Sequence, residues 1–93
     1  MNGLAVKNRN ETNIPLTFGE KTELLKRYEV YCYQVAFYLL QQEAGARLAA
    51  EEALLALYKL DGFFALTEHE RKEKVKAAAI RHALAVRSGR QPS

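Results

Sequence analysis

Residues 30–40 read Val-Tyr-Cys-Tyr-Gln-Val-Ala-Phe-Tyr-Leu-Leu, and only Gln34 among them is polar. The stretch is too short to cross a bilayer, which takes about 20 apolar residues. Apolar residues recur at steps of three and four, which predicts a helix with one face in a core: Leu24, Tyr28, Tyr31, Val35, Tyr38 and Leu39. Four more apolar residues fall on the opposite side: Val30, Tyr33, Phe37 and Leu40. We therefore expect this helix to be covered on two sides, either as the central helix of the domain or at a dimer or partner interface.

Two local signals predict the ends of this helix. Thr17 and Glu20 form a Thr-x-x-Glu pattern, in which each side chain satisfies a free amide at a helix start. Gly45 interrupts the apolar pattern and is expected to end the helix in a left-handed turn. Because the connection is short, the next helix should fold back on the first as an antiparallel hairpin.

A second helix is predicted from Ala46 or Arg47 to Leu60, with small and apolar residues facing the first helix. The residues of this inner stripe and its flanks are Ala50, Leu54, Leu57, Ala49, Ala53 and Tyr58. Asp61-Gly62 indicates a turn after the helix, and a single extra turn is expected around Phe63.

The third helix has the clearest start in the sequence. Thr67 is its predicted cap and Glu70 the reciprocal partner of that cap. The helix should run to Val86 or Arg87, before Ser88-Gly89 stops it.

These elements predict an all-α fold, a compact bundle of three principal helices. One helical domain is expected over residues 17–88. Residues 1–16 are interpreted as a flexible N-terminal arm and residues 89–93 as a frayed C-terminus.

The composition is that of an ordinary globular domain, because 48% of the 93 residues are hydrophobic and 27% are charged. A chain of this length can build one core and not two. Cys32 is the only cysteine, so no internal disulfide can form, and the N-terminal residues show no secretory pattern. We expect a protein of the reducing cytoplasm with no membrane partner.

The net charge of +3 is unevenly distributed along the chain. Residues 59–93 carry eight Lys and Arg against four acids, and no acid follows Glu73. Four basic residues of the third helix are candidates for binding nucleic acid through its phosphates: Lys72, Lys76, Arg81 and Arg87. The alternative is that these residues only balance the negative end of a helix dipole.

The chain lacks the residue patterns of a catalytic or metal site. Its two histidines, His69 and His82, would lie about 20 Å apart along the third helix, too far to share a metal ion. Cys32 falls in a hydrophobic helix where burial should keep it a thiol, and the five glycines are scattered rather than clustered for phosphate binding. We predict that the protein is not an enzyme and that it holds no cofactor and no metal.

Three motifs follow one another with a regular spacing. Tyr28-Glu-Val-Tyr31 opens an apolar helix, and after Gly45 the sequence continues with Ala50-Glu-Glu-Ala-Leu54 and then Leu57-Tyr58. An amphipathic helix with a basic end follows over residues 75–87. In this order the motifs resemble the second conserved region of bacterial sigma factors, particularly the extracytoplasmic-function type. The resemblance covers about two thirds of the chain and implies a helical module of transcription that binds RNA polymerase and promoter DNA.

The chain also departs from that family. The family has a glutamine and an acidic residue in the middle of its second helix, where they help it dock on the polymerase, and here Leu55 and Ala56 occupy those positions. The family unwinds promoter DNA with aromatic residues on its DNA-facing helix, whereas this third helix has no aromatic residue besides two histidines, and the chain has no Trp. The resemblance is therefore that of a partial or divergent member.

Two functions are expected from these observations. The first is a non-catalytic, sigma-like module that binds a protein partner, either the RNA polymerase core or a second sigma-like subunit, and also DNA. The residues expected to contact the partner are Glu51, Glu52, Leu55, Tyr33 and Phe37. The alternative is a homo-oligomeric structural or regulatory protein with no nucleic-acid role, in which Val30, Tyr33, Phe37 and Leu40 are buried across a two-fold interface.

Overall fold

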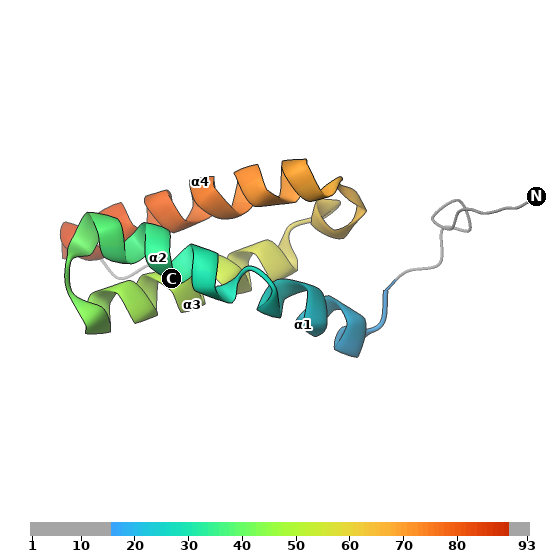
Figure 1. The fold of residues 1–93 in the computed structure, drawn as a ribbon, viewed down its shortest axis with the longest axis horizontal. Helices are drawn as coiled ribbons and strands as arrows, with labels where there is room; N and C mark the ends of the chain where they lie inside the picture. The colour runs from blue at the N-terminus through green and yellow to red at the C-terminus, as the bar shows by residue number, and fades with distance from the viewer. Residues whose placement is uncertain (1–15, 90–93) are drawn as a thin grey trace, which may run out of the picture.

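The computed structural model describes residues 16–89, and the expectations for residues 1–15 and 90–93 lie outside that range. Within it the chain forms helices and no strand, which confirms the all-α class. The elements are α1 (Phe18–Lys26), α2 (Glu29–Leu40), α3 (Glu43–Lys59), the short 3₁₀ helix η2 (Phe63–Ala65) and α4 (Glu68–Arg87). Figure 1 shows α2 and α4 running in the same direction with α3 antiparallel to both, and α1 extending the bundle beyond the start of α2.

The core forms where α2, α3 and α4 pack on one another, and most of its enclosed side chains are small. They are Cys32 and Ala36 from α2, Ala46, Ala49, Ala50 and Ala53 from α3, and Ala78, Ala79 and Ala83 from α4. Larger side chains are enclosed toward the η2 end of the bundle, where Leu57, Phe63 and Val75 belong to one cluster. Because small side chains let helix axes approach closely, the three helices cover one another along their length.

The capping signals of the sequence are confirmed at two helix starts. The Thr17 side chain accepts from the Glu20 amide at 3.1 Å, and the Glu20 carboxylate accepts from the Thr17 amide at 2.9 Å. Thr67 and Glu70 make the same pair of bonds at the start of α4, at 3.2 and 3.0 Å. The end of α4 at Arg87 and the extra turn at Phe63 are also as predicted.

One continuous first helix was expected, and this prediction is wrong because the chain bends between α1 and α2. The Arg27 amide donates to the Leu24 carbonyl at 3.2 Å and the Tyr28 amide to the Leu25 carbonyl at 2.9 Å, which tightens the backbone at the bend. There Tyr28 enters the core, and its hydroxyl accepts a hydrogen bond from Arg71 Nε at 3.3 Å. Between residues 16 and 89 the bundle therefore has four α-helices, and α1 is a separate element that packs on α2 and α3.

The turn after α2 lies at Gln41, so the prediction that Gly45 ends the helix is also wrong. Gln41 has the left-handed conformation, with φ of 55°, and its side chain donates to the Tyr38 carbonyl at 2.9 Å. Gly45 instead lies in the first turn of α3, where its amide donates to the side chain of Gln42. A Cβ atom at Gly45 would lie 2.9 Å from Gln42 Oε1 and 3.4 Å from Val86 Cγ1, so a glycine suits this position because of the space it leaves.

The inner face of α2 is rotated from the predicted one. Tyr28, Cys32 and Ala36 lie inward at steps of four residues, whereas Tyr38 was expected in the core and is 78% exposed. The reason is the close packing of α2 on the alanines of α3 and α4, which leaves room inside only for small side chains. Tyr31 lies on the same flank of α2 as Tyr38, because seven residues complete almost two turns, but it is half-buried and packs against the core.

Candidate nucleic-acid interface and apolar groove

The four basic residues proposed to bind nucleic acid lie on two flanks of α4. Lys72, Lys76 and Arg87 share one flank, since four and eleven residues bring the helix back to within about 40° of the same direction. Arg81 lies about 140° around the helix from Lys76 and therefore faces another side. Three of the predicted residues can act together on one surface, and Arg81 cannot join them.

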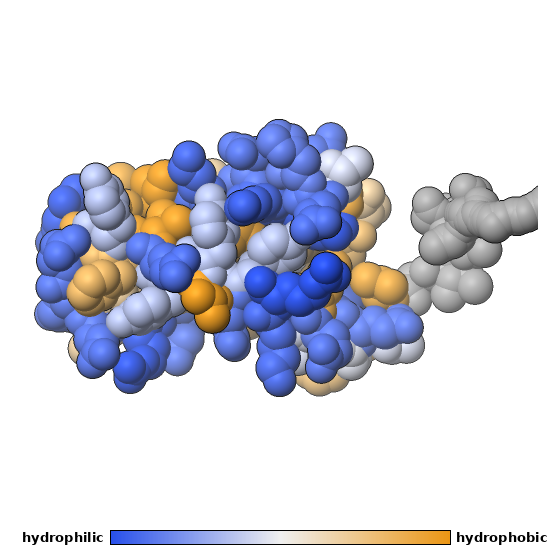
Figure 2. Space-filling model, in the orientation of Figure 1, coloured by the Kyte–Doolittle hydropathy of each residue, from blue (hydrophilic) through white to orange (hydrophobic). Residues whose placement is uncertain are grey.

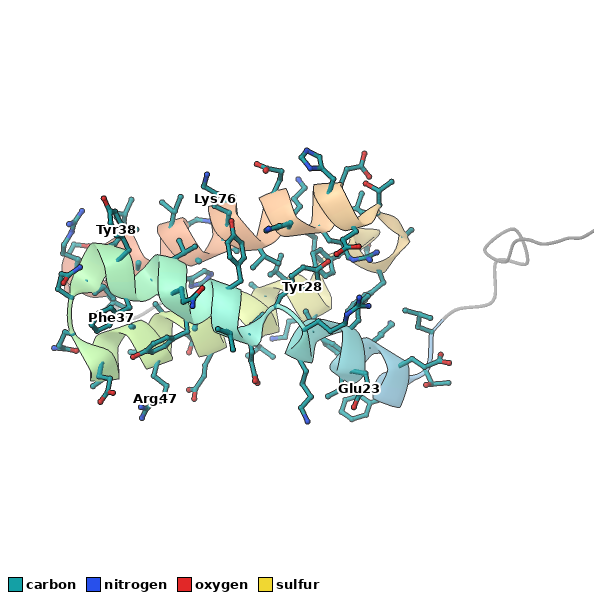
Figure 3. The ribbon with its side chains drawn as sticks, in the orientation of Figure 1. Glu23, Tyr28, Phe37, Tyr38, Arg47 and Lys76 are labelled. Atoms are coloured by element: carbon teal, nitrogen blue, oxygen red, sulfur yellow. The ribbon has the colours of Figure 1, made fainter. Side chains whose placement is uncertain are left out.

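The basic flank of α4 lies beside two tyrosines of α2. Lys72 Nζ lies 5.1 Å from the centroid of the Tyr31 ring, a cation–π contact that joins the two helices. Because α2 and α4 run in the same direction, Tyr38 lies further along the same seam, and Figure 3 shows Tyr38 and Lys76 along one edge of the bundle. We call this surface the α2–α4 face; its residues are Tyr31, Tyr38, Lys72, Lys76 and Arg87.

The C-terminal half of the α2–α4 face has no negative charge on its two helices. From Gln34 to Gln42 the chain carries no carboxylate, and none occurs from Lys74 to Gly89. Tyr38 is the most exposed of the large hydrophobic side chains within residues 16–89. An exposed aromatic ring beside lysine and arginine is the combination that binds unpaired bases, because the ring stacks on a base and the cations attract its phosphates.

A second surface is an apolar groove between α1 and α3, which we call the α1–α3 groove. It has a volume of about 380 Å³ and is lined by Phe18, Thr22, Leu25, Lys26, Glu29, Glu51, Leu54, Leu55 and Tyr58. Phe18 is 73% exposed and Leu55 is 50% exposed, so two large apolar side chains of the groove are open to solvent. The rings of Phe18 and Tyr58 lie edge to face at 6.0 Å.

The predicted partner-binding residues are divided between three places. Glu51 and Leu55 both line the α1–α3 groove. Glu52 lies toward α4, where its charge acts on His82. Tyr33 and Phe37 lie on the flank of α2 away from Tyr38, with their rings stacked at 5.9 Å and 22°.

Figure 2 shows hydrophobic side chains reaching the surface over the half of this view that α2 occupies. On α2 itself Val30 is 66% exposed and Tyr38 is 78% exposed, so this helix carries large apolar side chains that the bundle leaves uncovered. Sequence reasoning missed Phe18 and Tyr38 as surface residues. The sequence did carry one signal for the inner side of α2, because its smallest residues, Cys32 and Ala36, lie there.

Two titratable groups, Cys32 and His82, have pKa values shifted by burial. Cys32 is fully enclosed and burial raises the pKa of its thiol to about 11, which confirms that it stays protonated. Burial and the positive charge of Arg81 lower the pKa of His82, against a smaller opposing effect of Glu52. Residues 16–89 contain no group of three or more His, Cys, Asp or Glu side chains placed to hold a metal ion.

Comparisons with known protein families, with curated proteins and with solved structures found no match to this chain. None of the helices between residues 16 and 89 has both the length and the apolar character needed to span a membrane.

Proposed function

We propose that the protein is a non-catalytic, sigma-region-2-like module of transcription that binds single-stranded DNA on the α2–α4 face and a protein partner in the α1–α3 groove. The sequence motifs that resemble sigma factors support the role in transcription. The observation that carries the DNA-binding part is the exposed Tyr38 ring next to the basic flank of α4. A duplex keeps its bases stacked inside, whereas single-stranded DNA offers base faces to an exposed ring.

The aromatic residues that the sigma family carries on its DNA-facing helix have a counterpart in this proposal. α4 itself offers no aromatic ring apart from two histidines, but α2 contributes Tyr31 and Tyr38 to the same surface. Stacking on these tyrosines would hold the bases, while Lys72, Lys76 and Arg87 hold the phosphates.

The test is the binding of a fluorescent single-stranded oligonucleotide over a range of salt concentrations. Three phosphate contacts predict a slope of log affinity against log salt of about −2, since each contact contributes about −0.7 on a single strand. Lys76→Glu removes one phosphate contact, so the slope should become less steep by at least about 0.7. Tyr38→Ala should weaken binding roughly 5- to 150-fold at every salt concentration, with the slope unchanged, because stacking releases no counterions.

Arg81→Glu is the matched control for Lys76→Glu, because it makes the same charge change on another flank of α4. It should alter affinity and slope less than Lys76→Glu does. Equal effects of the two substitutions would mean that only net charge matters, and an unchanged affinity of Tyr38→Ala would remove the stacking role.

The α1–α3 groove supports the protein-binding part of the proposal. The groove is mainly apolar, so a partner would bury Phe18 and Leu55. Its charged residues are two carboxylates, Glu29 and Glu51, against one cation, Lys26, so they would favour a basic residue on that partner. The RNA polymerase core is the partner that the sequence resemblance indicates.

Retention of purified polymerase core on the immobilised protein tests this part. Leu55→Glu should abolish retention, because it places a charge in the groove. Leu84→Glu is the control, since Leu84 is exposed to a similar extent, at 43%, but lies on α4 outside the groove. Retention that survives Leu55→Glu, or no retention by the parent protein, would contradict the assignment of the groove.

A further inference from the structure

The flank of α2 that faces α3 carries apolar side chains that neither surface described above uses. Val30 is 66% exposed, Phe37 is 37% exposed, and Tyr33 is stacked on Phe37. Tyr33 lies about 140° around the helix from Tyr38, so this flank and the α2–α4 face point in different directions. A partner that covers this flank of α2 would therefore leave the α2–α4 face accessible.

Two opposite charges of α3 border this flank. Arg47 and Glu51 are both exposed and lie one helical turn apart on the side of α3 that faces α1 and α2. Figure 3 shows Arg47 at the same end of the bundle as Phe37. Glu51 lies toward the other end, where it lines the groove together with Glu29. Along this flank Arg47 lies nearer the α2–α3 turn and Glu51 lies further from it, with Glu43 one helical turn before Arg47.

The apolar side chains and the charges share one centre. Cys32 Sγ lies 3.9 Å from the Ala50 carbonyl oxygen, so in the antiparallel pair α2–α3 Tyr33 lies level with Ala49. Ala49 is the midpoint between Arg47 and Glu51 in the sequence, and Tyr33 lies next to the midpoint between Val30 and Phe37.

We propose that a second copy of this chain docks antiparallel on this flank and forms a two-fold symmetric dimer. A two-fold axis near Tyr33 brings Val30 of each copy to Phe37 of the other, and Arg47 of each copy to Glu51 of the other. An interface of this kind must be complementary to itself, and here the same rotation matches both the apolar residues and the charges. The proposal does not rest on nucleic-acid binding, because the α2–α4 faces of both copies stay outside the interface.

Sedimentation equilibrium of the full chain, from micromolar to millimolar concentration at low salt, measures the dimer directly. Arg47→Glu alone and Glu51→Arg alone should each raise the dissociation constant roughly tenfold, since each replaces two attractive pairs by two repulsive ones. An equimolar mixture of the two variants should associate as tightly as the parent, because the heterodimer restores both attractive pairs. Unfolding of either variant cannot produce that recovery.

Two further variants check the apolar contacts. Val30→Lys, at a side chain that is already exposed, should leave the protein folded and monomeric. Arg81→Glu on α4 is the control and should dimerise as the parent does. A parent that stays monomeric at millimolar concentration would overturn the proposal. So would a dimer that Val30→Lys leaves intact, or two charge variants whose mixture associates no better than either alone.

Discussion

The rotation of α2 within the bundle can be tested by two substitutions that are two residues apart. In the structure Ala36 is fully enclosed and Tyr38 is 78% exposed. A helix rotated as the apolar periodicity alone predicts would place Tyr38 inside. Tyr38→Ala and Ala36→Leu should therefore differ strongly in their effect on the free energy of unfolding.

The expected sizes follow from the exposed fractions. Truncating a fully buried aromatic side chain to alanine costs about 3–5 kcal/mol. With 22% of its surface covered (100 − 78), Tyr38 should lose about 0.5–1 kcal/mol, and the better helix propensity of alanine offsets about half a kcal/mol of that. Ala36→Leu adds three carbon atoms between packed helices, and overpacking of this kind costs about 1–3 kcal/mol.

Urea denaturation followed by far-ultraviolet circular dichroism gives both values. In a domain of this size a change of about 1 kcal/mol moves the melting temperature by about 4–8 °C, so thermal melts provide a second reading. A loss of more than about 2 kcal/mol in Tyr38→Ala, together with a neutral Ala36→Leu, would show that the helix is rotated the other way.

Three further predictions concern the turn, the core histidine and the cysteine. The change in the free energy of unfolding caused by Gly45→Ala should be more favourable in a Gln42→Ala background than in the parent, because Gln42 Oε1 occupies the space that the new Cβ needs. Urea denaturation of the parent, the two single variants and the double variant measures the coupling between the two positions. Additive effects of the two substitutions would contradict it. Because the folded-state pKa of His82 is below its ordinary value of 6.5, the unfolded chain takes up the proton first, so stability should fall as the pH drops below 6.5. His82→Gln should remove that part of the pH dependence, and an unchanged profile would exclude His82 as its source. The Cys32 thiol is buried and its pKa is raised to about 11, so it should react with a chromogenic disulfide reagent only after denaturation. Fast reaction of the native protein would contradict the burial of Cys32.

The elements that could be predicted from the sequence are those fixed by local chemistry. The Thr17–Glu20 and Thr67–Glu70 pairs satisfy free amides within a single turn, so four residues are enough to place each helix start. Gly62, with a φ of 83°, lies in the turn that Asp61-Gly62 predicts. These features depend on neighbours in the sequence and on nothing else in the fold.

Two of the three mispredicted features depend on contacts between distant parts of the chain, and the third, at Gln41, depends on a side-chain bond within one turn. The bend before α2 accompanies the burial of Tyr28 and its bond to Arg71, 43 residues away. Gln41 adopts a left-handed conformation that a non-glycine residue rarely shows, and it does so with its side chain bonded to the end of α2. Tyr38 lies outside the core because the alanines of α3 and α4 pack closely on α2. The apolar periodicity of α2 alone gives no information about that packing.

The candidate site was predicted in part for the same reason. The basic flank of α4 follows from the spacing of Lys72, Lys76 and Arg87 along one helix. That Tyr31 and Tyr38 lie beside this flank could be predicted only with the knowledge that α2 is parallel to α4 and of how α2 is rotated about its axis. Residue spacing within one helix therefore predicted half of the surface, and the packing of two helices supplied the rest.

The most direct measurement is a nuclear magnetic resonance titration of the isotope-labelled protein with a short single-stranded DNA at low salt. The account predicts that chemical shifts change along the α2–α4 face, at Tyr31, Tyr38, Lys72, Lys76 and Arg87, while Phe18 and Leu55 in the α1–α3 groove stay unchanged. Shift changes centred on the groove, or no changes when the oligonucleotide is in excess, would contradict it.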